Sequence, residues 1–328
     1  MMRAPVVLPF GPEAIARAAD LIAAGGIVAI PTETVYGLAA DAGSAGGVAR
    51  IYAAKGRPSF NPLIVHVPDL AAAEALAIFD ADATALAARF WPGPLTLVLP
   101  LRPGAPIATA VTAGLDTIAI RVPSHRAIRA LLAAAGCPLA APSANRSNGI
   151  SPTRAAHVVA SLGNAVPLVI DDGACPDGVE STIVRGREML RPGPIARDTL
   201  FPGESRGSDT GRLEAGPRPS PGKQAEARIT APGQLASHYA PSKPLRLNAI
   251  AAAHDEWLIG FGAVPGDDTL STTGDLAEAA ARLFDALHRA DASDRARIAV
   301  APVPAHGIGE AIADRLSRAA RPSLSSRA

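Results

Sequence analysis

Residues 12–30 read PEAIARAADLIAAGGIVAI, and this stretch decides the fold class. Apolar residues recur at helical spacing from Ile15 to Ile22, and Gly25-Gly26 is a typical stop signal for a helix. The four apolar residues Ile27–Ile30 follow at once and predict a buried strand. A helix that leads directly into a buried strand is typical of α/β proteins, so we expect a layered α/β architecture.

The same alternation continues towards residue 202. We predict further helices over 44–54, 124–135 and 153–161, and strands over 63–67, 95–101, 117–122, 168–170 and 182–185. Several of these strands are joined by short links, which predicts a mixed sheet rather than a purely parallel one. Residues 1–202 are therefore expected to form one α/β domain.

Beyond residue 202 the character of the chain changes. From Gly203 to about Pro232 there is no hydrophobic periodicity and there are many Gly and Pro residues, which predicts a linker over 203–242. Strands over 245–247, 258–261 and 298–300, with helices over 275–290 and 308–319, then predict a smaller α/β domain over 243–328.

Composition narrows the class of protein. Of 328 residues 48% are hydrophobic, which excludes a mainly disordered chain, and 31 basic against 30 acidic residues give a net charge of +1, which disfavours a nucleic-acid scaffold. Cys137 and Cys175 do not form a CxxC pair, so a disulfide framework or a zinc ribbon is not expected. We find neither a signal peptide nor a membrane span, and we expect a cytoplasmic protein.

Familiar nucleotide motifs are missing, because the chain has no GxxxxGK[ST] loop and no GxGxxG between a strand and a helix. Polar clusters at strand ends stand out instead, where ligands of open α/β sheets collect. The first is PTETVYGL, residues 31–38, in which two threonine hydroxyls follow a buried strand. The alternative is structural, since Thr32 or Thr34 could cap the following turn.

The second cluster is KGRPSFNPLIVH, residues 55–66. Lys55 is one of only three lysines in the chain, and it lies two residues from Arg57; one compact and one forked cation suit a polyphosphate. The alternative is a pair of cations that completes a helix C-terminus, which contributes about 0.3–1 kcal/mol each. His66 lies between two valines, and taken alone it favours a core histidine over a ligand-binding one.

The third cluster is PSANRSNGISPT, residues 142–153, a loop rich in hydrogen-bonding groups that leads into a helix. Backbone N–H groups at such a place bind anionic oxygens, although an ordinary Ser/Asn turn is the alternative. In the strand 117–122, Thr117 and Arg121 share one face, and a buried arginine requires an anionic partner. Shorter polar pieces are ESTIV at 180–184, LRPG at 190–193 and SHYAP at 237–241.

Taken together, these clusters resemble the YrdC-type threonylcarbamoyl-AMP synthases of the longer, two-domain branch. The resemblance rests on eight segments in family order between residues 27 and 241: PTETVYGLAADA, KGRPSFNPLIVHV, WPGPLTLVL, IAIRVP, APSANRSNGISPT, ESTIV, LRPG and PGQLASHYAP. It implies a YrdC-like twisted, open mixed sheet with helices, plus a smaller Rossmann-like α/β C-terminal domain. The C-terminal segment from about residue 243 carries the signature only loosely.

The resemblance also implies an activity, namely the synthesis of threonylcarbamoyl-AMP from L-threonine, bicarbonate (or CO₂) and ATP with release of pyrophosphate. Mg²⁺ would accompany ATP, and the metal ligands stay unassigned. The product would pass to a tRNA threonylcarbamoyl transferase complex, for modification of the adenosine beside the anticodon, with at most weak or transient contact to tRNA.

The resemblance assigns residues in three groups. Threonine would be held by Thr34, His66, Arg121, the backbone at Ala141, and Ser181. ATP would be held by Arg57, Asn61, Thr117, Ser143, Ser151, Arg191 and Tyr239. Catalytic roles fall to Lys55, Arg57, Ser143 and Asn145. Tyr239 would reach back from the linker to cover the nucleotide, with the linker as a lid over the site.

Two alternatives belong to other classes. A non-catalytic RNA-binding module of the same fold would present a basic concave face, which the near-zero net charge disfavours. A carbamoyl transferase for metal-centre maturation would need additional zinc-binding cysteines, and the chain has only two cysteines.

Overall fold

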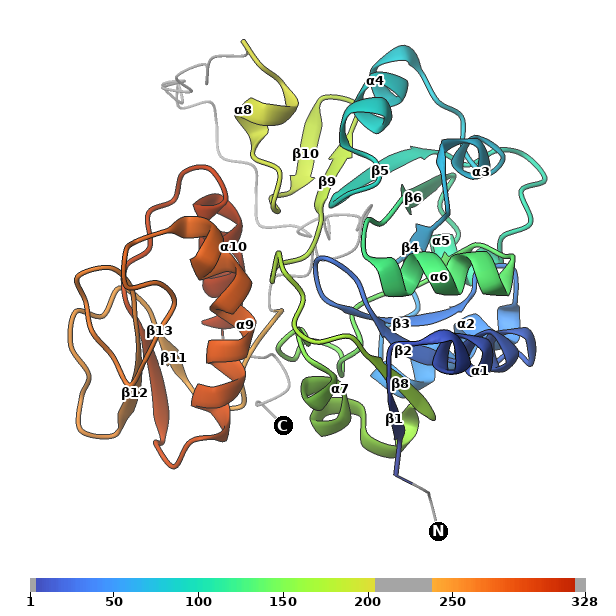
Figure 1. Cartoon of the computed structure of the whole chain (residues 1–328). Coiled ribbons are helices and arrows are strands. Elements are labelled where there is room, and N and C mark those ends of the chain that lie inside the picture. Colours follow the sequence, from blue (N-terminus) through green and yellow to red (C-terminus); the bar gives the residue numbers. More distant parts are fainter. Residues whose placement is uncertain (1–3, 204–237, 322–328) are drawn as a thin grey trace, which may run out of the picture.

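The computed structural model describes residues 4–203 and 238–321 (Figure 1). The described residues form a large α/β domain followed by a smaller α/β domain, which agrees with the expected fold class. Most of the predicted linker, residues 204–237, lies outside the described residues, so its predicted role as a lid stays a prediction.

A ten-stranded sheet organises the large domain within residues 4–203. Its order is β1-β8-β2-β3-β7-β4-β6-β5-β9-β10. Parallel pairs such as β4 with β6 alternate with antiparallel pairs such as β5 with β6, so the predicted mixed sheet is confirmed. The strands are β1 (Val6–Pro9), β2 (Val28–Pro31), β3 (Tyr36–Asp41), β4 (Ile64–His66), β5 (Leu95–Pro100), β6 (Thr117–Arg121), β7 (Leu139–Ala140), β8 (Leu168–Asp171), β9 (Thr182–Arg185) and β10 (Glu188–Arg191).

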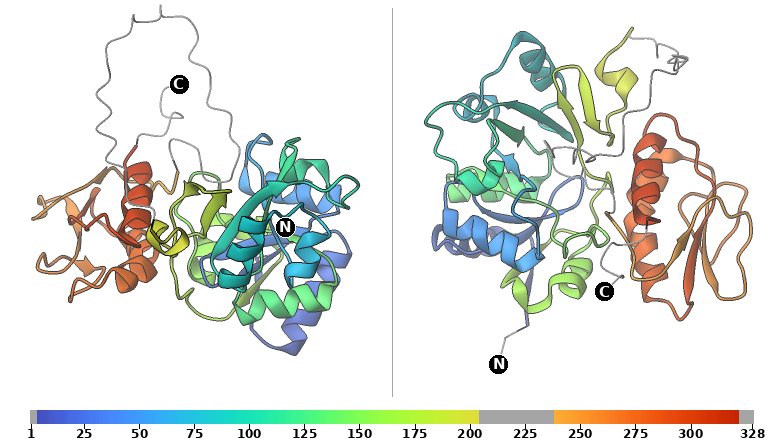
Figure 2. Two further views of the ribbon diagram at one scale, coloured as in Figure 1. Left: turned by 90° about the horizontal axis from the view of Figure 1, so that it is seen from above. Right: turned by 180° about the vertical axis from the view of Figure 1, so that it is seen from behind.

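Helices cover both faces of this sheet (Figures 1 and 2). The core of one face contains the apolar stripe of α1, including Ile15 and Ile22, and the stripe of α6, including Leu131; the core of the other contains Ile51 of α2. The helices are α1 (Pro12–Ala23), α2 (Ala45–Lys55), α3 (Leu70–Glu74), α4 (Ala81–Phe90), α5 (Thr109–Thr112), α6 (Arg126–Ala135), α7 (Ala155–Leu162) and α8 (Arg197–Leu200).

The smaller domain is built on a parallel sheet of β11 (Leu245–Arg246), β14 (Arg297–Val300), β12 (Glu256–Gly260) and β13 (Asp268–Thr269), in that order. Helices α9 (Leu276–Ala292) and α10 (Gly309–Ala319) lie on the side of this sheet that faces the large domain (Figures 1 and 2). A parallel sheet whose last two strands in the chain, β13 and β14, are joined through α9 agrees with the expected Rossmann-like domain.

The predicted elements agree with the structure to within two residues at each end. Several elements were not predicted, among them β3, α4 and β10. The predicted polar loop after β2 is therefore only four residues long, Thr32–Val35, before β3 begins at Tyr36. Within the described residues, the structure contains no helix that is both long and apolar enough to span a bilayer.

Candidate functional site

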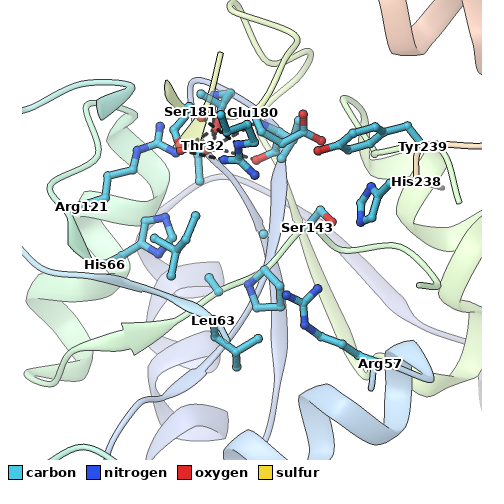
Figure 3. A pocket seen from close by; sticks show the side chains of 17 residues that line it. Thr32, Arg57, Leu63, His66, Arg121, Ser143, Glu180, Ser181, His238 and Tyr239 are labelled. Carbon is cyan, nitrogen blue, oxygen red and sulfur yellow. Dashed lines mark hydrogen bonds between the residues drawn. The ribbon is translucent and has the colours of Figure 1, made fainter. Parts of the chain in front are cut away.

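A pocket opens where loops from distant parts of the chain meet (Figure 3). Its walls come from the loop after β2, the end of β4, the end of β6, the loop after β7, the segment before β9, the end of β10 and the segment before β11. These are the ends of strands, where ligands of open α/β sheets bind. The pocket thus collects most of the polar clusters that the sequence singled out.

Nine of the residues predicted for the site line this pocket: Thr34, Arg57, His66, Arg121, Ala141, Ser143, Ser181, Arg191 and Tyr239. The other five predicted residues do not line it: Lys55, Asn61, Thr117, Asn145 and Ser151. The two groups differ in what their side chains contact.

Arg121 is held in place at the end of β6. Its Nη2 lies 2.6 Å from Oε1 of Glu33, Nη1 donates to Oγ1 of Thr34 over 3.0 Å, and Nε donates to the carbonyl of Gly93 over 3.1 Å. Burial alone would raise the pKa of Glu33, but the charge and hydrogen bonds of Arg121 lower it to about 2. The sequence pointed to Thr32 and Thr34 but not to Glu33 between them. The expectation that a buried Arg121 requires an anionic partner could have identified it.

His66 lies beside Arg121 at the end of β4, and it is almost fully buried. Burial, and then the charge of Arg121, lower the pKa of His66 to about 3, so the ring is neutral at physiological pH. Among the described residues Nδ1 of His66 has no hydrogen-bond partner with good geometry. Because a buried polar atom without a partner is costly, a pocket-lining nitrogen of this kind is suited to a polar substrate.

Lys55 does not line this pocket, and its predicted catalytic role stays a prediction. It is the last residue of α2, and its Nζ donates to the carbonyls of Ser143 over 2.5 Å and Asn145 over 2.6 Å. Burial, and then the charge of Arg57, lower the pKa of Lys55 well below its usual value. The ammonium group thus fixes the loop after β7 from behind, which places Lys55 as a support of Ser143 rather than as a group in the pocket.

Arg57 follows the C-terminal glycine of α2 and points into the pocket (Figure 3). Its Nε donates to the carbonyl of Asn61 over 3.1 Å and its Nη2 to the carbonyl of Pro62 over 2.8 Å, so the 55–62 loop orients its own cation. The side-chain amide of Asn61 is fully buried, and neither of its polar atoms has a hydrogen-bond partner among the described residues. Asn61 does not line this pocket, and its predicted contact with ATP stays a prediction.

Ser181 and Arg191 form the opposite wall. Arg191 ends β10 and donates through Nε to the carbonyl of Ser181 and through Nη2 to its Oγ, both over 3.0 Å. The same Oγ lies 2.8 Å from Oγ1 of Thr96 on β5. Gly193 makes this wall possible, because a Cβ there would lie 2.3 Å from the backbone nitrogen of Thr182.

Thr117 and Ser151 lie away from the pocket lining. Thr117 starts β6, opposite Pro100 of β5, whereas Arg121 ends the same strand in the pocket. Ser151 is fully buried, and its hydroxyl donates to Oε1 of Glu180. The resemblance implies that Thr117 and Ser151 bind ATP. Neither residue lines this pocket, so this role stays a prediction.

His238 and Tyr239, the first described residues after position 237, also line the pocket. Tyr239 is 1% exposed, and its hydroxyl has no hydrogen-bond partner among the described residues although it borders the pocket. Burial and the cations Arg57 and Lys55 lower the pKa of His238 well below its usual value. Sequence reasoning missed His238, whose only signal was its place beside Tyr239.

The acidic, histidine and cysteine side chains of the described residues are dispersed. Within residues 4–203 and 238–321 there is no group of three His, Cys, Asp or Glu side chains that could coordinate a metal. The carboxylate that lines the pocket, Glu180, is bonded to Arg315 and Ser151. The pocket-facing donors are arginines and hydroxyls, which suit anions.

Comparisons with known proteins show the family of this chain. Residues 20–193 match the Sua5/YciO/YrdC family model, whose description is "telomere recombination". Residues 208–321 match the model of the threonylcarbamoyl-AMP synthase C-terminal domain.

Curated relatives match over nearly the whole chain. The threonylcarbamoyl-AMP synthase of Bacillus subtilis is 38% identical, over 93% of this chain and 92% of its own. That of Pyrococcus abyssi is 37% identical, over 92% of each chain. The crystal structure of P. abyssi Sua5 complexed with L-threonine superposes with a TM-score of 0.81 at 34% identity, covering 96% of this chain and 97% of that one. The chain therefore belongs to the Sua5/YciO/YrdC family and, within it, to the threonylcarbamoyl-AMP synthases, which are enzymes.

Proposed function

We propose that the pocket binds L-threonine and ATP side by side and makes threonylcarbamoyl-AMP from them with bicarbonate or CO₂, releasing pyrophosphate. The observation that carries this proposal is the convergence of Arg57, Arg121 and Arg191 on one pocket with a single carboxylate in its lining, Glu180. Because Glu180 is itself paired with Arg315, the pocket favours anionic ligands. The crystal structure of the P. abyssi relative is a complex with L-threonine, and this supports the amino-acid half of the proposal.

Threonine fits the side of the pocket formed by Arg121, Thr34 and His66. Arg121 would approach the carboxylate of the amino acid, with Glu33 and Thr34 fixing the orientation of its guanidinium group. The neutral ring of His66 offers an unpartnered nitrogen to a polar group of the substrate. The amino group of threonine must itself be neutral to capture CO₂ as a carbamate, with loss of one proton.

ATP fits the side formed by Arg57, Ser143 and Arg191. The carbamate oxygen would attack the α-phosphorus, the bond between that phosphorus and the oxygen bridging to the β-phosphate would break, and pyrophosphate would leave. This reaction needs reactants held in line and negative charge neutralised, and it needs no protein nucleophile. Arg57 would neutralise the charge of the phosphates. Ser143, on the loop that Lys55 holds, would help to keep the reactants in line.

Mg²⁺ would enter with the triphosphate rather than reside in the protein, because it keeps most of its water ligands and the pocket lacks a carboxylate cluster. The product would leave for a tRNA-modifying transferase. A net charge of +1 supports at most weak contact with tRNA.

The test measures pyrophosphate release by the purified full chain with ATP and each amino acid, with and without bicarbonate. We expect a signal that requires both threonine and bicarbonate. Arg57→Ala should lower it by about 100-fold, because a preorganised charge at the phosphates is lost. The matched control is Arg102→Ala, an exposed arginine outside the pocket that donates to the carbonyl of Glu74.

A signal that ignores the amino acid would contradict the proposal. So would an absence of pyrophosphate together with salt-sensitive binding of RNA, which is the result expected of a non-catalytic binding module.

A further inference from the structure

The segment 178–181, which carries Ser181 into the pocket, lies directly on the second domain. A Cβ on Gly178 would lie 2.4 Å from the carbonyl oxygen of Ala280 and 2.4 Å from the Cα of Ala281, so its backbone contacts the backbone of α9. Next in the chain, Val179 is fully buried in the core of the second domain, together with Phe284 of α9. The pocket wall before β9 is therefore shaped by α9.

Arg315 of α10 reaches the same segment. Its side chain is fully buried, and its Nε donates to Oε2 of Glu180 over 2.8 Å. The other carboxylate oxygen of Glu180 accepts from Ser151, so both oxygens are fixed. Burial alone would raise the pKa of Glu180, but Arg315 and then Arg191 lower it, so the carboxylate is held charged next to Ser181.

Arg315 also faces the residue that closes the pocket. Its guanidinium carbon lies 5.2 Å from the ring centroid of Tyr239, which is within the range of a cation–π contact. The Tyr239 ring packs against Phe284 of α9 with centroids 5.7 Å apart. Arg315 itself does not line the pocket.

We propose that Arg315 is a positioning residue through which the second domain sets the affinity of the pocket for ATP. Arg315 bonds to Glu180 and its guanidinium carbon lies over the Tyr239 ring, so one cation joins two walls of the pocket. The proposal rests on the proposed function, in that it takes the ligand beside Tyr239 to be the nucleotide. It gives the second domain a direct part in substrate binding.

The first arm of the test replaces Arg315. Arg315→Met should raise the KM for ATP and the Kd for ATP by about 10-fold, because Glu180 and Tyr239 lose their common support. Arg315→Lys keeps the charge near Glu180 but not the planar fork, so it should recover only part of the affinity. The matched control is Arg297→Met, an exposed arginine of the same domain paired with Asp255, which should leave both constants unchanged.

The second arm perturbs the contact from the large domain without touching Arg315. Gly178→Ala pushes the segment away from α9, whereas Gly173→Ala imposes a similar positive-φ strain with nothing within 4 Å of the added methyl group. We expect the Kd for ATP to rise for Gly178→Ala and to match the wild type for Gly173→Ala. The double variant Glu180→Gln with Arg315→Met should bind ATP no more weakly than the weaker-binding single variant, because the two substitutions remove the same interaction.

The thermal midpoint of each variant shows whether it folds. The concentration of folded protein is then used to calculate its Kd for ATP. If Arg315→Met does not fold, Arg315→Lys decides. A Kd for ATP equal to that of the wild type in every folded Arg315 variant overturns the inference. A wild-type chain that binds ATP but releases no pyrophosphate contradicts the proposed function and leaves the ATP-affinity comparison intact.

Discussion

At the residue scale, the two basic residues of the KGR motif have separate tasks. Lys55 and Arg57 are two positions apart and read alike in the sequence, yet only Arg57 lines the pocket. The ammonium of Lys55 instead joins α2 to a loop that is 88 residues away. Sequence reasoning identified both cations as unusual but could not assign the acceptors, because a contact with a distant backbone carbonyl leaves no pattern in the sequence.

This difference gives a prediction for Lys55. Lys55→Met should lower the free energy of unfolding by about 1–3 kcal/mol, because the buried carbonyls of Ser143 and Asn145 lose their donor. Arg57→Met should lower pyrophosphate release at least as much with a smaller loss of stability. Denaturant titrations and pyrophosphate assays on the two variants measure this. If Lys55→Met and the wild type had the same free energy of unfolding, Lys55 would not support the loop that carries Ser143.

At the element scale, the sheet explains why the site lies where it does. Strands such as β5 and β6 were predictable because their apolar and β-branched residues stand in runs bounded by turn residues. β3 was not, since Tyr36–Asp41 continues the motif that had been interpreted as a ligand loop. β10 pairs with β9 through an irregular register between Met189 and Arg191, and such irregularities are not visible in a short polar sequence.

The β9–β10 region gives the second prediction. Gly193→Ala should reduce both stability and adenylate formation, because its methyl group would overlap the backbone of Ser181 and Thr182 and push Arg191 away from Ser181. The matched control is Gly11→Ala, with extended backbone and nothing within 4 Å of the added Cβ. Thermal midpoints and pyrophosphate assays compare the two. A Gly193→Ala enzyme as active and stable as the Gly11→Ala enzyme would be inconsistent with the close approach.

At the scale of the whole molecule, the two domains share buried histidines and a core. His288 of α9 stacks on His157 of α7 with ring centroids 3.9 Å apart, and its Nε2 lies 3.1 Å from the carbonyl oxygen of Ser151. His157 in turn lies 3.2 Å from the carboxylate of Asp285. The sequence predicted two domains and a linker, but the pairing of residues more than a hundred positions apart follows only from how the domains dock.

The docked histidine gives a prediction about pH. Burial, and then His157, lower the pKa of His288 to about 4 from 6.5. As the pH falls below 6.5, the unfolded chain takes up a proton at this histidine, whereas the folded chain does so only near pH 4. Proton uptake therefore favours the unfolded state, and the free energy of unfolding decreases as the pH drops from 6.5 towards 4. His288→Gln, which keeps a donor near Ser151, should therefore flatten the loss of unfolding free energy over this range.

Urea titrations at several pH values measure that slope. His254→Gln is the matched control, because the side chain of His254 is 96% exposed. An equally steep slope in His288→Gln and wild type would assign the acid sensitivity to other groups.

The contact between Arg315 and Glu180 also has a consequence for the order of synthesis. Every strand of the large sheet leaves the ribosome before α10 does, so that sheet can form while Glu180 still lacks its cation. A chain that stops short of α10 lacks both the cation that bonds to Glu180 and part of the apolar core that packs around Val179. The pocket wall before β9 therefore reaches its final form only after translation has passed Arg315.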